Sequence, residues 1–150
     1  MSTTSGAVPQ PIVVGVDGSP HSVQALRWAV QQAQLTGAPV QAVTAWQWPT
    51  VNLYTPAVTP LPDISQQTRA ALARVVADAL NAQPDVDVEQ QVVEGHPVTV
   101  LLEKAKSASL LVVGSRGHDG FTGMLLGSVG SHCVSHAPCS VVVVRPDAQP

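Results

Sequence analysis

Residues 110–128 read LLVVGSRGHDGFTGMLLGS, and this stretch decides the fold. Its apolar start, Leu110–Val113, predicts a buried strand, and its end leads into a short helix predicted over Ser128–Ser135. Residues 114–128 hold five of the eleven glycines in the chain. A buried strand that passes through glycines into a helix is typical of α/β proteins, in which parallel strands alternate with helices.

The glycine-rich stretch has the features of an anion-binding turn. Gly114 and Gly117 permit positive φ and close backbone approach. Gly127 and Ser128 begin a helix, whose free N–H groups and positive dipole end attract a phosphate, and Arg116 and the Ser128 hydroxyl would add donors. The alternative is that the glycines only form a flexible lid or allow tight packing. Neither Gly-x-Gly-x-x-Gly nor Gly-x4-Gly-Lys-Ser/Thr, the established nucleotide fingerprints, occurs in the chain.

The same alternation extends over the rest of the chain. Four further strands are predicted over Ile12–Val16, Val40–Trp46, Val86–Val93 and Ser140–Arg145. Three further helices are predicted from apolar residues spaced i, i+3, i+4, i+7: Leu26, Ala29, Val30 and Ala33; Leu72, Val75, Val76 and Ala79; Val98, Leu101, Leu102 and Ala105. The third strand is the more polar one, which suits a sheet edge. We expect one doubly wound, parallel, five-stranded α/β domain over residues 11–146, with helices on both faces and flexible ends at 1–10 and 147–150.

Composition excludes several classes of function. The chain has 150 residues and a net charge of −3, and its seven basic residues are scattered, which argues against a nucleic-acid-binding module. The N-terminus does not resemble a secretion signal, and no apolar run approaches the length of about 18 residues that crosses a bilayer. Two cysteines in a chain of this size do not indicate a disulfide framework. We therefore expect a cytoplasmic protein that does not insert into membranes.

Three segments resemble the universal stress protein family, over roughly residues 10–146. The family pattern Gly-x2-Gly-x9-Gly-Ser/Thr is met by residues 114, 117, 127 and 128, and VGVDGS at 14–19 and HAPCSVVVVR at 136–145 match as well. The resemblance implies a sheet in the order 3-2-1-4-5, which places the ends of the first and fourth strands side by side at a ligand-binding switch point. It also implies a homodimer joined through the strand that contains Val141–Val144. The alternative is a monomer whose edge is protected by Arg145 and Pro146.

The resemblance implies roles for individual residues in binding ATP, with or without Mg²⁺. Asp17 would meet the adenosine end, and the backbone at Ala45 would contact adenine. The ribose and phosphates would lie against Gly114, Arg116, Gly117, Gly127, Ser128 and Val129. The chain departs from the family at Gly130, where Ser or Thr is frequent, so a hydroxyl donor is absent there.

Other readings of these residues stay open. Asp17 is also a common turn or cap residue. His132, Cys133, His136 and Cys139 are residue types that bind zinc, but neighbours on a helix point about 100° apart, and we expect no metal site from this set. His96 and His118 lie on predicted loops, where a histidine is most often solvated. Trp46, Trp48 and Tyr54 would cover adenine or simply pack the proline-rich segment 47–63 over the core.

The function expected is that of an ATP-binding stress-response or regulatory module with at most slow hydrolysis. No catalytic residue is expected, because Asp119 is the only carboxylate in the glycine-rich stretch and no lysine accompanies it. The alternatives are a nucleotide-free dimeric interaction protein, and a slow ATPase or phosphoryl-transfer enzyme.

Overall fold

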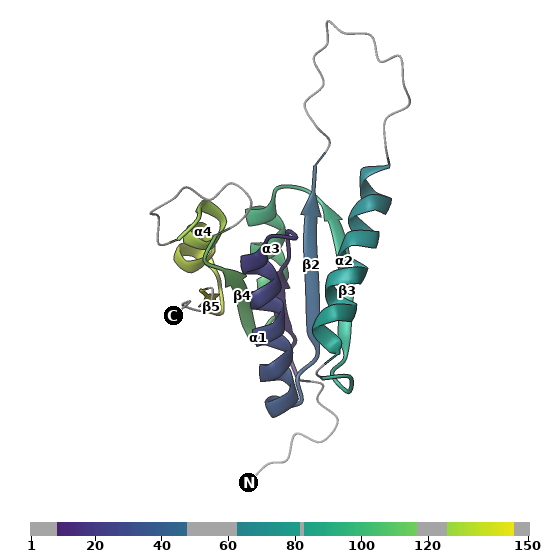
Figure 1. The fold of residues 1–150 in the computed structure, drawn as a ribbon. Coiled ribbons are helices and arrows are strands. Elements are labelled where there is room, and N and C mark those ends of the chain that lie inside the picture. Colours follow the sequence, from purple (N-terminus) through teal and green to yellow (C-terminus); the bar gives the residue numbers. More distant parts are fainter. Residues whose placement is uncertain (1–8, 48–62, 82, 117–125, 146–150) are drawn as a thin grey trace, which may run out of the picture.

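A five-stranded parallel sheet forms the centre of the molecule, in the order β3-β2-β1-β4-β5 (Figure 1). The computed structural model describes residues 9–47, 63–81, 83–116 and 126–145. The strands are β1 (Ile12–Gly15), β2 (Val40–Trp46), β3 (Val88–Glu94), β4 (Leu110–Gly114) and β5 (Ser140–Val144). The helices are α1 (Pro20–Thr36), α2 (Ile64–Leu80), α3 (Pro97–Ala105) and α4 (Ser128–His136). The predicted fold class and strand order are confirmed.

Two apolar clusters lie on opposite faces of the sheet. One joins α1 and α2 to one face through buried residues such as Leu26, Val30 and Leu72, and the other joins α3 and α4 through residues such as Leu101 and Cys133. Alternate residues of one strand reach different clusters, because successive side chains of a strand point to opposite faces. The sheet is therefore buried on both faces, as expected for parallel strands.

The ends of several predicted elements are corrected. β3 begins at Val88 rather than Val86, β1 ends at Gly15 rather than Val16, and β5 ends at Val144. Val16 leaves the strand pattern because the chain turns there into α1, although its N–H still donates to the carbonyl of Val43 at 2.8 Å. β3 lies at a sheet edge, as its more polar sequence predicts, and β5 lies at the other edge, as the strand order implied by the resemblance requires.

The inner face of α3 also differs from the predicted one. Val100, Leu101 and Ala105 are buried, whereas Val98 and Leu102 are only half-buried. The helix is rotated so that Val100 packs against Gly95 and Leu101 packs against Gly15. Gly95 has a φ of +148°, a backbone conformation that glycine adopts readily. By contrast, all four apolar positions predicted for α1 are buried.

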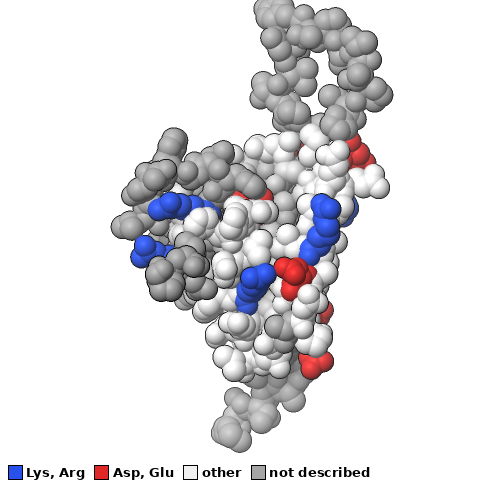
Figure 2. Space-filling model, in the orientation of Figure 1, with Lys and Arg blue, Asp and Glu red and all other residues white. Residues whose placement is uncertain are grey.

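None of the helices within the described residues combines the length and the apolarity needed to cross a bilayer. Figure 2 shows basic and acidic side chains spread over the described part of one face of the molecule, some of them next to one another, with no continuous basic surface there.

Candidate functional site

The chain reverses its direction of sheet growth between β1 and β4. These two strands are parallel neighbours, with Ile12 opposite Leu110 and Val14 opposite Val112. β1 continues through α1 to β2 on one side, while β4 continues through α4 to β5 on the other (Figure 1). The carboxyl ends of strands at such a switch point border the crevice in which doubly wound proteins bind ligands.

The turn after β1 is built by Asp17. A carboxylate oxygen of Asp17 accepts a hydrogen bond from the N–H of Ser19 at 2.9 Å, and the N–H of Asp17 donates to the hydroxyl of Ser22 at 3.2 Å. Gly18 has φ +84°, and Ser19 then caps α1 by accepting from the N–H of Ser22. The structural role considered for Asp17 is therefore present. Asp17 is also exposed at the carboxyl edge of the sheet, where a ligand contact is compatible with the turn.

Ser115 links three elements at this edge. Its N–H donates to the carbonyl of Val144 at 2.9 Å, and its carbonyl accepts from the N–H of Gly127 at 2.6 Å. Its hydroxyl lies 3.5 Å from Nδ1 of His21, in the first turn of α1. Ser115 is only 2% exposed, so these contacts hold the end of β4 between the starts of α1 and α4.

Sequence reasoning missed Ser115 and His21 as members of the site. Ser115 is adjacent to Gly114 in the motif, and that position was the available signal. His21 carries no such signal, because 94 residues separate it from Ser115 and only the strand order brings them together.

Gly114 is required for close packing rather than for an unusual backbone angle. It is not among the described glycines with positive φ, so that part of the prediction is wrong. A Cβ built on Gly114 would lie 2.8 Å from both the carbonyl carbon and the carbonyl oxygen of His21. The close-approach part is confirmed, but the approaching group is the backbone of α1. Gly117, the next glycine of the motif, lies outside the described residues.

The N-terminus of α4 has backbone donors that find no acceptor among the described residues. Gly127 is the N-cap, and no side chain caps this helix, whereas Ser19, Asp63 and His96 cap the other three helices. The N–H of Gly127 is engaged by Ser115, and the first helical hydrogen bond runs from Ser131 to Gly127. Within the described residues, this leaves the N–H groups of Ser128, Val129 and Gly130 without an acceptor. Free N–H groups at the positive end of a helix suit an anion.

Gly130 is buried inside this first turn. A Cβ at Gly130 would lie 2.8 Å from Cδ1 of Leu126, so the side chain of Leu126 takes the space that a family Ser or Thr would use. The carbonyl oxygen of Gly114 lies 3.5 Å from the same point. The missing hydroxyl is therefore coupled to the packing of Leu126 over the helix start.

Ala45 presents its backbone groups on the side of β2 that faces the end of β1. The pairing of β2 with β1 ends at Gly15 opposite Val43, whereas its pairing with β3 continues to Trp46 opposite Glu94. The carbonyl of Val43 points to β1 and that of Trp46 points to β3, as their acceptor roles show. Because these directions alternate along a strand, the backbone groups of Ala45 point toward the space beyond the end of β1. A donor and an acceptor on one residue suit the edge of a planar heterocycle.

Arg116 is half-buried, two residues beyond the end of β4. The structure therefore brings Asp17, Ala45, Gly114, Arg116, Gly127, Ser128 and Val129 to one edge of the sheet. Four other residues that the sequence analysis considered near the site lie outside the described residues: His118, Asp119, Trp48 and Tyr54.

The four residues considered as a zinc set do not converge. Cys133 is fully buried in the core, and burial raises the pKa of its thiol to about 11. His132 and His136 lie on the exposed side of the same helix. Burial also raises the pKa of Cys139, which lies just before β5. No group of three or more metal-binding side chains occurs among the described residues.

His96 has a structural role, because its Nδ1 accepts from the N–H of Val98 at 3.2 Å as the N-cap of α3.

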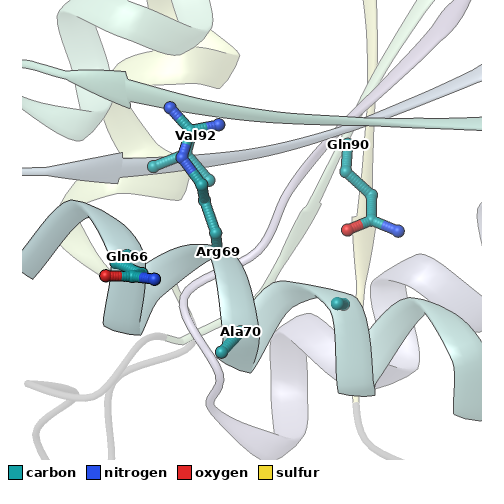
Figure 3. Close-up of a pocket in the computed structure, with 6 residues that line it drawn as sticks. Gln66, Arg69, Ala70, Gln90 and Val92 are labelled. Atoms are coloured by element: carbon teal, nitrogen blue, oxygen red, sulfur yellow. The ribbon is translucent and has the colours of Figure 1, made fainter.

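A separate groove of about 500 Å³ lies between α2 and the edge strand β3 (Figure 3), lined by Gln66, Arg69, Ala70, Ala73, Gln90 and Val92. Its volume would admit a small molecule, but five of its six lining residues are exposed. None of the predicted site residues lines this groove.

The strand order defines a doubly wound α/β domain, and the carboxyl edge of its sheet at the switch point is the candidate ligand site. Residues 9–145 match the model of the universal stress protein family. A universal stress protein of Mycolicibacterium smegmatis is 41% identical over 138 residues, which are 91% of this chain and 46% of that relative. The chain belongs to the universal stress protein family. It spans about half the length of the curated relatives it matches.

Solved structures agree with this assignment. A universal stress protein crystallised in complex with cAMP has a TM-score of 0.69 and 31% identity, covering 94% of this chain and 100% of that one. The universal stress protein of Archaeoglobus fulgidus in complex with dAMP has a TM-score of 0.62 over 92% of this chain and 99% of that one. At 21% identity, the second likeness shows the fold alone.

Proposed function

We propose that this protein binds ATP in the crevice between β1 and β4 and acts as a nucleotide-dependent regulatory module in stress tolerance. The observation that carries the proposal is the uncapped start of α4, where three backbone N–H groups have no acceptor among the described residues. The cAMP complex of the 31% identical relative supports an adenine nucleotide as the ligand.

The roles proposed for individual residues are those implied by the family resemblance, and the positions of the described residues are compatible with them. The N–H groups of Ser128 and Val129 would receive the terminal phosphates, and Arg116 would add a positive charge at the same edge. The backbone of Ala45 would pair with the edge of adenine, and Asp17 would accept hydrogen bonds from the ribose hydroxyls. Gly117 and Gly114 would complete the cradle. Mg²⁺, when present, would be held mainly by the phosphates themselves.

A binding role is favoured over an efficient enzyme. Asp17 offers a carboxylate at the end of β1, and we assign it to the ribose rather than to catalysis. Phosphoryl transfer also needs a group that positions the attacking nucleophile. Hydrolysis would therefore be slow.

The free edge of β5 supports a homodimer. Val141 to Val144 are only half-buried, and a strand at a sheet edge presents unpaired backbone groups on its outer side. The relatives are about twice as long as this chain, so two copies would match one relative in size. Light scattering of the purified protein at micromolar concentration should give the mass of two chains; a monomer mass would exclude this assembly.

We also propose that the protein acts in the cytoplasm.

The test is nucleotide binding by calorimetry, with Gly127→Ala as the main variant. Gly127 has φ −74° and ψ 172°, which alanine adopts without strain, so the fold should tolerate the change. The new methyl group would project beside the phosphate cradle, and we expect the affinity for ATP to fall at least about tenfold, or about 1.4 kcal/mol. Equal affinity of parent and variant, at equal melting temperature, would remove the α4 terminus from the site.

A nucleotide-free dimeric interaction protein is the second candidate. It is favoured by the contact between Gly114 and His21, which explains one motif glycine without any ligand. Mass spectrometry of small molecules that co-purify with the protein distinguishes the two candidates. Co-purified ATP supports the first, whereas protein that neither carries nor binds adenine nucleotides supports the second.

A further inference from the structure

Two histidines lie one helical turn apart on the outer side of α4. His132 and His136 are both exposed, their ring centroids are 6.3 Å apart, and the ring planes are tilted by 30°. Residues at i and i+4 lie on the same face of a helix, so both side chains project toward the same volume of solvent. We expected no metal site from the full set of four, because adjacent helix residues point apart, and Cys133 is buried in the structure, but these two histidines are not adjacent and share one face.

The ring of His132 is held in a defined state. Its Nδ1 lies 2.8 Å from the carbonyl oxygen of Ser128. A carbonyl oxygen only accepts hydrogen bonds, so Nδ1 is the donor in this contact, and the neutral tautomer that fits it has its lone pair on Nε2. Histidines that bind metals typically donate their second ring nitrogen to a carbonyl or carboxylate in this way. Ser128 thus orients His132 as a metal ligand would be oriented.

The distance between the rings is close to what a chelate requires. With metal–nitrogen bonds of about 2.1 Å and tetrahedral angles, the centres of two ligating imidazoles lie about 5 Å apart. The observed separation is 6.3 Å, about 1 Å more than this, so His132 can stay on Ser128 while the exposed ring of His136 turns its lone pair toward the same ion. Both residues are exposed, so core packing does not fix either ring.

The position on the helix favours a cation. His136 is the last residue of α4, where the exposed carbonyl groups give the helix its negative end. Neutral imidazoles bind borderline cations such as Zn²⁺, Ni²⁺ and Cu²⁺, whereas Mg²⁺ and Ca²⁺ prefer oxygen ligands. We propose that His132 and His136 form a two-histidine chelate for a divalent ion of the Zn²⁺, Ni²⁺ and Cu²⁺ class, with water as the remaining ligands. This site is separate from the proposed nucleotide function.

Calorimetric titration with ZnCl2 at pH 8 tests the site, because metal ions compete with protons for imidazole nitrogen. The parent chain should bind one Zn²⁺, and His132→Ala and His136→Ala should each weaken binding by at least about tenfold, since each removes one arm of the chelate. The matched control is His96→Asn, which removes an exposed imidazole from α3 and keeps a good N-cap, and it should bind as the parent does. The site is refuted if the parent takes up no Zn²⁺ at millimolar concentration, or if only one of the two alanine variants is impaired.

A second measurement needs no substitution. Paramagnetic Ni²⁺ added in small amounts to the parent should broaden the NMR ring signals of His132 and His136 before those of the other three histidines. Broadening that begins at any other histidine would overturn the assignment.

Discussion

Gly114, at the end of β4, lies against the backbone of His21, at the start of α1. The space where a Cβ would stand on Gly114 is 2.8 Å from the His21 carbonyl carbon and 2.9 Å from its Cβ. This contact sets how closely the first turn of α1 approaches the crevice. It also allows the hydroxyl of Ser115 to lie 3.5 Å from the His21 ring.

Gly114→Ala should therefore lower the free energy of unfolding by about 2 kcal/mol, because the backbone of α1 cannot yield locally to an inserted methyl group. Urea unfolding measures this. Gly15→Ala is the matched control, since its Cβ would lie at the same 2.8 Å, but from the terminal Cδ1 of Leu101. That flexible side chain can rotate away, so the cost at Gly15 should be clearly smaller. Equal costs at the two glycines would contradict the packing explanation.

The sheet and most of its helices are predictable from sequence because they depend on periodic burial. The i, i+3, i+4, i+7 spacing of Leu26, Ala29, Val30 and Ala33 names the inner face of α1 correctly. The rotated face of α3 was not predictable, because it depends on the packing of Val100 against Gly95 and of Leu101 against Gly15. Those contacts join residues whose pairing no local pattern encodes.

Part of the candidate site was likewise predictable from sequence, and part of it was not. Its glycines and Asp17 follow from the resemblance, which also provides the strand order. The overhang of β2 beyond β1 exposes the backbone of Ala45, and it depends on the register of Gly15 against Val43. The contact between Ser115 and His21 depends on tertiary packing. Residue patterns carry neither kind of information.

Asp17→Asn should separate the role of Asp17 in the turn from its proposed contact with the nucleotide. Asparagine keeps the oxygen that accepts from the N–H of Ser19, so the unfolding free energy should change by less than about 0.5 kcal/mol. The affinity for ATP should nevertheless fall about tenfold, because a charge-assisted bond to the ribose becomes a neutral one. Asp17→Ala should show both defects. If the asparagine variant binds ATP as tightly as the parent, Asp17 serves the turn alone.

Gly130→Ser should restore a hydroxyl donor near the phosphate cradle. Serine is favoured over glycine within a helix, and Leu126 can move its Cδ1 away from the new side chain. We expect ATP to bind about fivefold more tightly, corresponding to about 1 kcal/mol from one added hydrogen bond. Gly130→Ala is the control, because it displaces Leu126 equally but adds no donor. A gain in the alanine variant as large as in serine would attribute the effect to Leu126.

The buried thiol of Cys133 should make stability depend on pH above 9. Burial raises its pKa from 9.0 to about 11 in the folded protein. Between these values the unfolded chain loses the thiol proton while the folded chain keeps it, so the free energy of unfolding should fall as the pH rises. Below pH 9 both states hold the proton and this contribution is constant.

Urea unfolding at pH 8, 9 and 10.5 measures the decline, with Cys133→Ala as the comparison. The variant should start less stable, because a small cavity replaces the sulfur, but it should lose less stability over this interval. Parallel curves for parent and variant would mean that Cys133 titrates in the same range in both states.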